Sequence, residues 1–233
     1  MSTIIDFHSH ILPGMDDGSE TAEMSEQMLK LSKEQGIDVI AATPHFYAEQ
    51  MTLDMFLKRR ETAFLTIQDA AACRGISLLL GAEAAFFPGI GNAGGIQQLT
   101  IRGTSILLLE MPSREWNSRD IEEVEQLLAR GITPLLAHIE RFIPYQKDRR
   151  MIRRLYSLPI LAQVNGGALL NWRTRRLALR LFSQGMAHLL GSDCHNLTTR
   201  PPNLAEGRNM IEKKLGRRCL SQIDRLGREI SGL

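Results

Sequence analysis

Short apolar runs alternate with amphipathic segments along nearly the whole chain. Seven runs have the length and composition of buried strands, at residues 3–7, 37–43, 76–81, 105–110, 133–138, 159–164 and 186–192. Between most of them, apolar residues recur every three to four positions. This spacing predicts helices at residues 20–36, 52–75, 118–131, 147–157 and 172–185, with further helices at residues 203–215 and in the tail.

This alternation predicts an α/β fold. Strands that are apolar at almost every position are typical of parallel strands covered by helices on both sides. A closed or distorted (β/α)7 barrel of the TIM type fits seven such repeats better than an open doubly wound sheet. We find no internal repeat and no linker, so a single domain is expected over residues 1–233, with its least regular part at residues 82–104.

Composition and charge narrow the class of protein. Of the 233 residues, 43% are hydrophobic and 23% charged, as in ordinary globular proteins, and the net charge of +2 does not favour a nucleic-acid partner. Three basic segments (residues 147–154, 171–180 and 212–218) are interpreted as solvated helix faces, with a polyanion footprint as the alternative.

The compartment is expected to be the cytoplasm. The chain has no 18-residue apolar run and no signal peptide pattern at its start, so no membrane insertion is expected. Its three cysteines (Cys73, Cys194 and Cys219) are odd in number and widely spaced, which favours reduced thiols.

Metal-ligating residue types follow six of the seven predicted strands. They are His8, His10, His45, Glu83, Glu110, His138, Asp193 and His195. Because catalytic groups of α/β barrels lie at the carboxyl ends of the strands, we expect these side chains to meet. The sixth histidine, His188, lies at the opposite end of its strand and is interpreted as structural.

The types of ligand indicate the chemistry. A mixture of imidazoles and carboxylates without thiolates suits zinc, manganese or iron. The two histidines of an H-x-H sequence on a strand project from the same face and can grip one ion. The number of candidate ligands suggests two or three ions.

Several motifs together resemble a known family. "DFHSHILPGMDDG" (6–18), "TPH" (43–45), "GAE" (81–83), "LLLE" (107–110), "AHIER" (137–141) and "GSDCHNLTTRPP" (191–202) are similar to motifs of the polymerase-and-histidinol-phosphatase (PHP) superfamily. The similarity is greater to its bacterial tyrosine-phosphatase branch, the capsule and exopolysaccharide phosphatases of the CpsB/YwqE type. It extends from residue 4 to about residue 212.

The resemblance implies a three-metal centre in a distorted seven-stranded barrel. It assigns a first ion to His8, His10, Glu83 and Asp193, and a second to Glu83, Glu110 and His138. It assigns a third ion to Asp17, His45 and His195, and it matches Arg141 and Arg200 to arginines that grip phosphate. Asp16, beside Asp17, is interpreted as structural.

The same resemblance implies the activity and the partner. The chain would be a metal-dependent protein-tyrosine phosphatase, with manganese first and iron or zinc as alternatives. Its substrate would be the phosphorylated tail of a membrane-associated tyrosine autokinase that controls capsule or exopolysaccharide synthesis. A phosphoesterase of the histidinol-phosphate type and a catalytically idle metal-binding domain are the alternatives, and the oligomeric state is left open.

Two features of the sequence could mislead. Residues 194–200 fit C-x5-R, the pattern of cysteine-dependent tyrosine phosphatases. However, Asp193 precedes the cysteine and would raise the pKa of its thiol, so a thiolate nucleophile is disfavoured. In the loop at residues 84–104, Phe86 and Phe87 are interpreted as packing residues, with a role in substrate access as the alternative.

Overall fold

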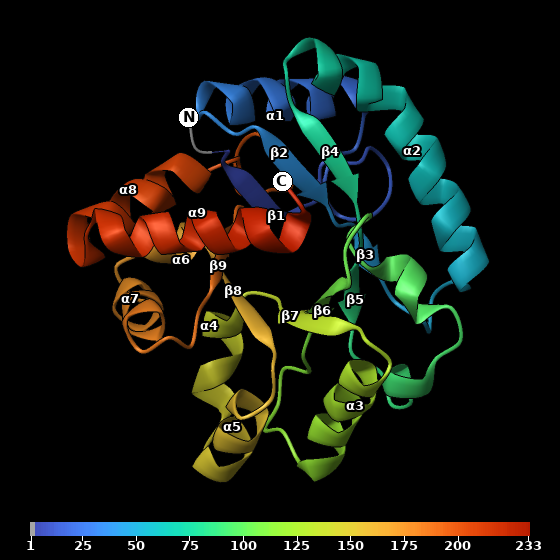
Figure 1. Ribbon diagram of the computed structural model, residues 1–233. Helices are drawn as coiled ribbons and strands as arrows, with labels where there is room; N and C mark the ends of the chain where they lie inside the picture. The colour runs from blue at the N-terminus through green and yellow to red at the C-terminus, as the bar shows by residue number, and fades with distance from the viewer. Residues whose placement is uncertain (1–2) are drawn as a thin grey trace.

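A computed structural model describes residues 3–233 as a curled parallel sheet surrounded by helices (Figure 1). The strands are β1 (Ile5–Ser9), β2 (Val39–Ala42), β3 (His45–Phe46), β4 (Ser77–Leu80), β5 (Glu83–Ala85), β6 (Ile106–Glu110), β7 (Thr133–Leu136), β8 (Leu161–Asn165) and β9 (Leu189–Gly191). The helices are α1 (Ala22–Glu34), α2 (Leu53–Cys73), α3 (Ser118–Ala129), α4 (Ile139–Phe142), α5 (Arg149–Tyr156), α6 (Gly166–Leu170), α7 (Arg175–Ser183), α8 (Leu204–Leu215) and α9 (Arg217–Ser231).

All strand pairs are parallel, and their order follows a ring. The order β4-β2-β1 forms one part, and β3-β5-β6-β7-β8-β9 forms the other. A bridge between Ser9 and Cys194 joins the end of β1 to the segment after β9, so the first and last strands meet. The predicted distorted α/β barrel is confirmed.

Two of the seven predicted strands are interrupted. β2 and β3 are successive pieces of the second strand, separated at Pro44, which has no N–H to donate to a neighbour. β4 and β5 are pieces of the third strand, separated at Gly81. A side chain at Gly81 would place its Cβ 3.1 Å from Ile101 and 3.2 Å from Thr43. Within residues 82–104, expected to be the least regular part of the chain, the structure has the short strand β5 and two 3-10 turns at Ile90–Asn92 and Ile96–Leu99.

The predicted helices form close to their expected positions. Thr21 and Thr52 cap α1 and α2 by accepting hydrogen bonds from backbone N–H groups, as helix N-caps commonly do. Gly36 and Gly75 follow these two helices with φ values of 78° and 64°, a conformation that favours glycine. The helix expected at residues 172–185 begins later, at Arg175, because the short helix α6 precedes it.

The inside of the barrel is apolar at one end and charged at the other. Ile106 and Leu108 on β6 belong to an inner apolar cluster, together with alternate residues of β2 and β7. Leu226 and Ile230 of α9 pack against the same cluster. Because side chains of a strand alternate between its faces, Glu110 continues the inner face of β6 and ends it with a carboxylate.

Among residues 3–233, no helix combines the length and the apolar character needed to cross a bilayer.

Candidate metal centre

Nine residues predicted as metal ligands converge at the carboxyl ends of the strands. β1 carries His8, with His10 directly after it, and β3, β5 and β6 carry His45, Glu83 and Glu110. His138 follows β7, Asp193 and His195 follow β9, and Asp17 comes from the loop after β1. These side chains therefore lie together as expected. Their role as metal ligands stays a prediction.

Glu83 lies at the centre of this cluster. Its carboxylate is fully buried and contacts four imidazoles. One oxygen, Oε2, lies 3.1 Å from His8 Nε2, 3.2 Å from His10 Nε2 and 3.0 Å from His45 Nδ1. The other, Oε1, lies 2.8 Å from His138 Nε2. A single carboxylate is thus placed to share its oxygens among several cations.

Asp193 approaches the same histidines from the other side. Its Oδ1 lies 3.4 Å from His8 Nε2 and 3.5 Å from His10 Nε2. Arg141 Nη2 donates to Oδ2 of this carboxylate at 2.6 Å, and Arg200 Nη2 donates to Oδ1 at 2.8 Å. Both predicted phosphate-binding arginines therefore reach the cluster.

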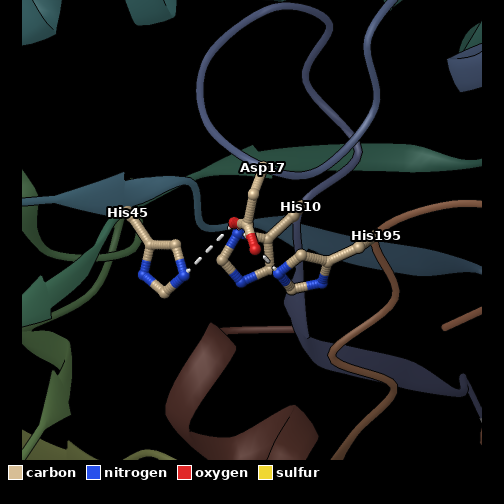
Figure 2. A group of neighbouring side chains, drawn as sticks. All are labelled: His10, Asp17, His45 and His195. Carbon is tan, nitrogen blue, oxygen red and sulfur yellow. Dashed lines mark ion pairs between the residues drawn. The ribbon is translucent and has the colours of Figure 1, made fainter.

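A further group opens towards solvent (Figure 2). His10, His45 and His195 surround Asp17, whose Oδ1 lies 3.6 Å from His45 Nε2 and 3.4 Å from His195 Nε2. Whereas the three rings are buried or nearly so, the Asp17 side chain is 65% exposed. This group gives the cluster an accessible side.

Four overlapping groups have ligand atoms that lie within 4.8 Å of one another. They are His10–Asp17–His45–His195, His8–His10–Asp193, His8–Glu83–His138 and His45–Glu83–Glu110. The geometry differs from the predicted division into three sets. His8 also belongs with Glu83 and His138, His10 also belongs with the exposed group, and His45 also belongs with Glu83 and Glu110.

Hydrogen bonds behind the rings aim their Nε2 atoms at the centre. His8 Nδ1 donates to Gln163 Oε1 at 3.2 Å, His10 Nδ1 to Asp16 Oδ2 at 2.7 Å, and His195 Nδ1 to the Asp193 carbonyl at 3.0 Å. A ring that donates from Nδ1 in this way leaves Nε2 to bind a metal, as ligating histidines commonly do.

The centre also contains buried polar atoms without partners. Within the described chain, Glu83 Oε2, His45 Nδ1 and His195 Nε2 are buried and have no hydrogen-bond partner. Since an unsatisfied buried polar atom is costly, such a concentration is explained if cations occupy the centre. The residues present therefore fit a metal site.

The protonation of the cluster supports the same conclusion. Burial lowers the pKa of His10, but its hydrogen bond to Asp16 and the adjacent Glu83 carboxylate raise it overall to about 10. Burial works against the charged form of Glu83 too, yet the charge of His8, the hydrogen bond from His138 and the other adjacent imidazoles hold its pKa well below the usual range. Without metal, protons on imidazoles supply the positive charge that these carboxylates require.

Gln163 and Asn165 are site residues that the sequence analysis missed. Gln163 Oε1 also accepts from the His138 backbone N–H at 2.8 Å, and its Nε2 donates to Asn165 Oδ1 at 2.7 Å. Asn165 Nδ2 in turn donates to Asp193 Oδ2 at 2.6 Å. The available signal was an amide within the otherwise apolar run of β8 and a second amide two residues later, on the same face.

Asp16 positions the site without entering it. One oxygen accepts from His10 and from the His45 backbone N–H at 2.8 Å, and the other accepts from the Gly18 N–H at 2.9 Å. The His10 charge and these hydrogen bonds outweigh burial and lower the pKa of Asp16 to about 2. This agrees with the structural role predicted for it.

Backbone strain is concentrated in the same place. His138 and Asp193 are the non-glycine residues with positive φ within residues 3–233, at 28° and 52°. Such conformations cost free energy and persist where surrounding contacts impose them. Here they turn the His138 and Asp193 side chains towards Glu83 and the two arginines.

Neither Cys194 nor His188 joins the cluster chemistry. The Cys194 side chain is buried, and burial together with the nearby Asp6 raises the pKa of its thiol far above the usual range. The cysteine-phosphatase interpretation is therefore disfavoured by the structure as well. His188 lies at the other end of β9, where its Nδ1 accepts from the Ala162 N–H at 3.0 Å.

The fold and the site together define an α/β barrel protein with a buried histidine–carboxylate cluster that could bind metal ions. The family follows from the sequence: a family model described as "Capsular polysaccharide synthesis, CpsB/CapC" matches residues 4–226. This chain belongs to the CpsB/CapC family, which confirms the resemblance drawn from its motifs.

Characterised relatives span the chain. It is 26% identical over 230 residues to the tyrosine-protein phosphatase CpsB of Streptococcus agalactiae, covering 94% of both proteins. It is 27% identical over 217 residues to the tyrosine-protein phosphatase YwqE of Bacillus subtilis, covering 91% of this chain and 85% of YwqE.

The fold is shared with a solved structure. That structure belongs to a set of crystal structures of YwqE from Bacillus subtilis and CpsB from Streptococcus pneumoniae, which are described as unique metal-dependent tyrosine phosphatases. The TM-score is 0.86 at 23% identity, covering 98% of this chain and 94% of the other.

Proposed function

We propose that this chain is a metal-dependent protein-tyrosine phosphatase, a phosphoric monoester hydrolase formed by a single domain. The observation that carries the proposal is the convergence of five imidazoles and three further carboxylates around Glu83. Membership of the CpsB/CapC family and the names of the relatives above support the choice of substrate.

The nine converging residues would hold two or three divalent ions. Manganese is the first choice of metal, and iron and zinc are the alternatives. They are His8, His10, Asp17, His45, Glu83, Glu110, His138, Asp193 and His195. Bound ions of this kind supply a water of lowered pKa for attack on phosphorus and offset the negative charge of the phosphate.

Arg141 and Arg200 would bind the phosphate oxygens. In the structure their guanidinium groups engage the two oxygens of Asp193, and their side chains are 47% and 35% exposed. They therefore stand between the cluster and solvent, where a phosphate group enters. A planar guanidinium matches a pair of phosphate oxygens and stabilises the additional charge that develops in the transition state.

A cavity next to the exposed group would accommodate the aromatic ring. It has a volume of about 280 Å³, and its lining includes Asp17, His45, Met15, Tyr47 and Met51. The Tyr47 ring lies 5.1 Å from the His45 ring, centroid to centroid. Thioether and aromatic side chains directly beside two candidate ligands suit a phenyl phosphate better than an alkyl phosphate.

The proposed substrate is a phosphotyrosine in the tail of a membrane-associated tyrosine autokinase that controls capsule or exopolysaccharide synthesis. We place this reaction in the cytoplasm. The three cysteines are all unpaired, as expected for a reducing compartment. A phenolate leaves more readily than an alkoxide because tyrosine has a pKa near 10, so the site needs no strong general acid.

Turnover of two substrates tests the proposal. The protein loaded with Mn²⁺ is expected to hydrolyse a phosphotyrosyl peptide faster than histidinol phosphate, and a chelator should abolish both activities. Cys194→Ser should leave the rate nearly unchanged. Faster hydrolysis of histidinol phosphate would favour the alternative phosphoesterase, and loss of activity in the serine variant with survival in chelator would favour a cysteine nucleophile.

A further inference from the structure

Two of the basic segments seen in the sequence face one another across a groove. The segment at residues 147–154 overlaps α5 and the one at residues 171–180 overlaps α7, and Figure 1 shows both helices on the outside of the barrel near α4. The groove between them has a volume of about 600 Å³. None of the nine candidate metal ligands lines it.

The groove combines an apolar floor with a cationic rim. The floor includes Ile143, Ile152, Leu177, Leu181 and Met186. The rim carries Arg149, Arg153 and Arg180, whose side chains are exposed. No aspartate or glutamate is among the residues that line it, all of which lie in the described part of the chain.

These three arginines differ from their neighbours on the same helices. Arg150 forms hydrogen bonds with both oxygens of Asp148, and Arg154 does so with Glu125. By contrast, none of the three rim arginines forms a salt bridge within residues 3–233. Asp148 acts on Arg153 only through its charge, without a salt bridge between the two side chains.

We propose that this groove binds an acidic polypeptide segment. An apolar or aromatic side chain of that segment would lie on the floor, and flanking carboxylates would pair with the rim guanidiniums. Charge complementarity selects an anionic partner. The recessed apolar floor selects a chain with side chains to insert, because an anionic membrane surface presents no such projection.

The position of the groove suggests which polypeptide binds. It begins at Ile143, directly after the helix α4 that carries Arg141 into the metal centre. A chain with its phosphotyrosine at Arg141 could therefore continue into the groove. Resting on the proposed function, this makes the acidic segment part of the phosphoprotein substrate, so the groove would lower KM without changing kcat.

Direct binding tests the groove independently of catalysis. The probe is a short fluorescein-labelled peptide with several glutamates around one phenylalanine, compared with the same peptide carrying glutamines. By fluorescence anisotropy the full-length protein should bind the glutamate peptide about tenfold more tightly, with an affinity that falls as salt is added. Equal affinity for the two peptides would overturn the proposal.

Charge reversal assigns the binding to the rim. The triple variant Arg149→Glu, Arg153→Glu and Arg180→Glu should lose the preference, while the corresponding lysine variant should keep most of it. The control is a triple reversal of exposed arginines outside the groove, Arg119→Glu, Arg217→Glu and Arg218→Glu. It makes the same change in net charge and should leave the preference intact. An equal loss in the control would mean that only net charge matters, against the proposal.

Two other occupants would be revealed by the same variants. If the rim reversal abolished binding to phosphatidylserine vesicles and spared the peptide, the groove would be a membrane contact. If it changed the sedimentation mass and spared the peptide, the face would be an interface between copies of this chain. Either result contradicts the proposal.

Kinetics then separate the groove from the catalytic function. With a phosphotyrosyl peptide that carries the acidic segment, the rim reversal should raise KM about tenfold at unchanged kcat and leave p-nitrophenyl phosphate turnover unaffected. An unchanged KM would overturn the link to the substrate. If the Mn²⁺-loaded protein hydrolysed no phosphotyrosyl peptide at all, the proposed function would fail while the anisotropy measurement still decided the groove.

Discussion

At the residue scale, Arg141 and Arg200 are the cationic side chains that face the open side of the cluster. Arg141→Ala and Arg200→Ala are each expected to lower kcat on a phosphotyrosyl peptide by about 10²–10³, the usual cost of losing one preorganised charge at the transition state. Steady-state kinetics with Mn²⁺ measure the effect. Arg119→Ala on the exposed side of α3 serves as the control, and rates within about threefold of the wild type for both variants would remove these arginines from the mechanism.

Asp16 affects metal binding through His10. Asp16→Ala removes the acceptor for His10 Nδ1 and for the His45 N–H, so both rings lose part of their orientation. Metal affinity should fall about 10–100-fold, as it does when the carboxylate behind a ligating histidine is lost. Calorimetric titration with Mn²⁺ provides the measurement.

The matched control for Asp16 is Asp69→Ala, which removes an exposed carboxylate from α2. It should bind Mn²⁺ like the wild type. If Asp16→Ala also bound Mn²⁺ with unchanged affinity, its hydrogen bonds would serve the loop alone.

Individual residues were predictable where their chemistry interrupts an apolar run at a strand end. His45, Glu83 and Glu110 follow such runs, and the structure places all three in the cluster. Gln163 and Asn165 were not predicted because neutral amides are common at strand ends and carry no charge that would require a partner. Their role depends on His8 and Asp193, which lie far away in the sequence and become neighbours only when the ring of strands closes.

At the scale of elements, α3 begins at a reciprocal pair of hydrogen bonds. The Asn117 side chain accepts from the Arg119 and Asp120 N–H groups, while the Asp120 carboxylate accepts from the Asn117 N–H at 2.9 Å. Asn117→Ala removes one half of this capping box and should lower the free energy of unfolding by about 1 kcal/mol. Urea denaturation measures it.

The neighbouring exposed Ser118 is the control for that measurement. Ser118→Ala should change the free energy of unfolding by less than about 0.5 kcal/mol, since Ser118 is exposed and is not a member of the capping box. Equal losses for the two alanine variants would show that α3 does not depend on its cap.

Element type was easier to predict from the sequence than element continuity. Seven apolar runs correspond to the seven strand positions, because burial on both faces leaves a simple signal. The interruption at Gly81 depends on contacts with Thr43 and Ile101 that no local pattern reveals. The short helix α4 was also missed, since its four residues are too few to show a helical period.

At the scale of the whole molecule, the two ends of the barrel divide stability and function. The apolar cluster under α9 holds the strands together, whereas the opposite end collects carboxylates and imidazoles whose mutual repulsions and desolvation oppose folding. The positive φ values of His138 and Asp193 and the orphaned atoms around Glu83 all lie at the second end. Such a division is typical of a barrel whose site is built on a separately stabilised frame.

His188 belongs neither to the apolar cluster nor to the metal centre. It makes the free energy of unfolding depend on pH independently of the metal centre. Burial lowers its pKa below the ordinary value, and its Nδ1 must be unprotonated to accept from the Ala162 N–H that links β8 to β9. Below the unfolded-state pKa of about 6.5, the unfolded chain therefore binds a proton that the folded protein resists. The stability from neutral His188 is fully present above that pKa and is lost as the pH falls below it.

Comparison with His188→Gln isolates this contribution, because both proteins share every other titrating group. Between about pH 7.5 and about pH 5.5, the wild type should lose more free energy of unfolding than the variant, as measured by urea denaturation at each pH in the presence of saturating Mn²⁺. The variant cannot gain a proton at this position, so its curve should be the flatter of the two. Parallel curves would mean that the folded protein accommodates a charged His188, and that the hydrogen bond to Ala162 does not hold these strands together.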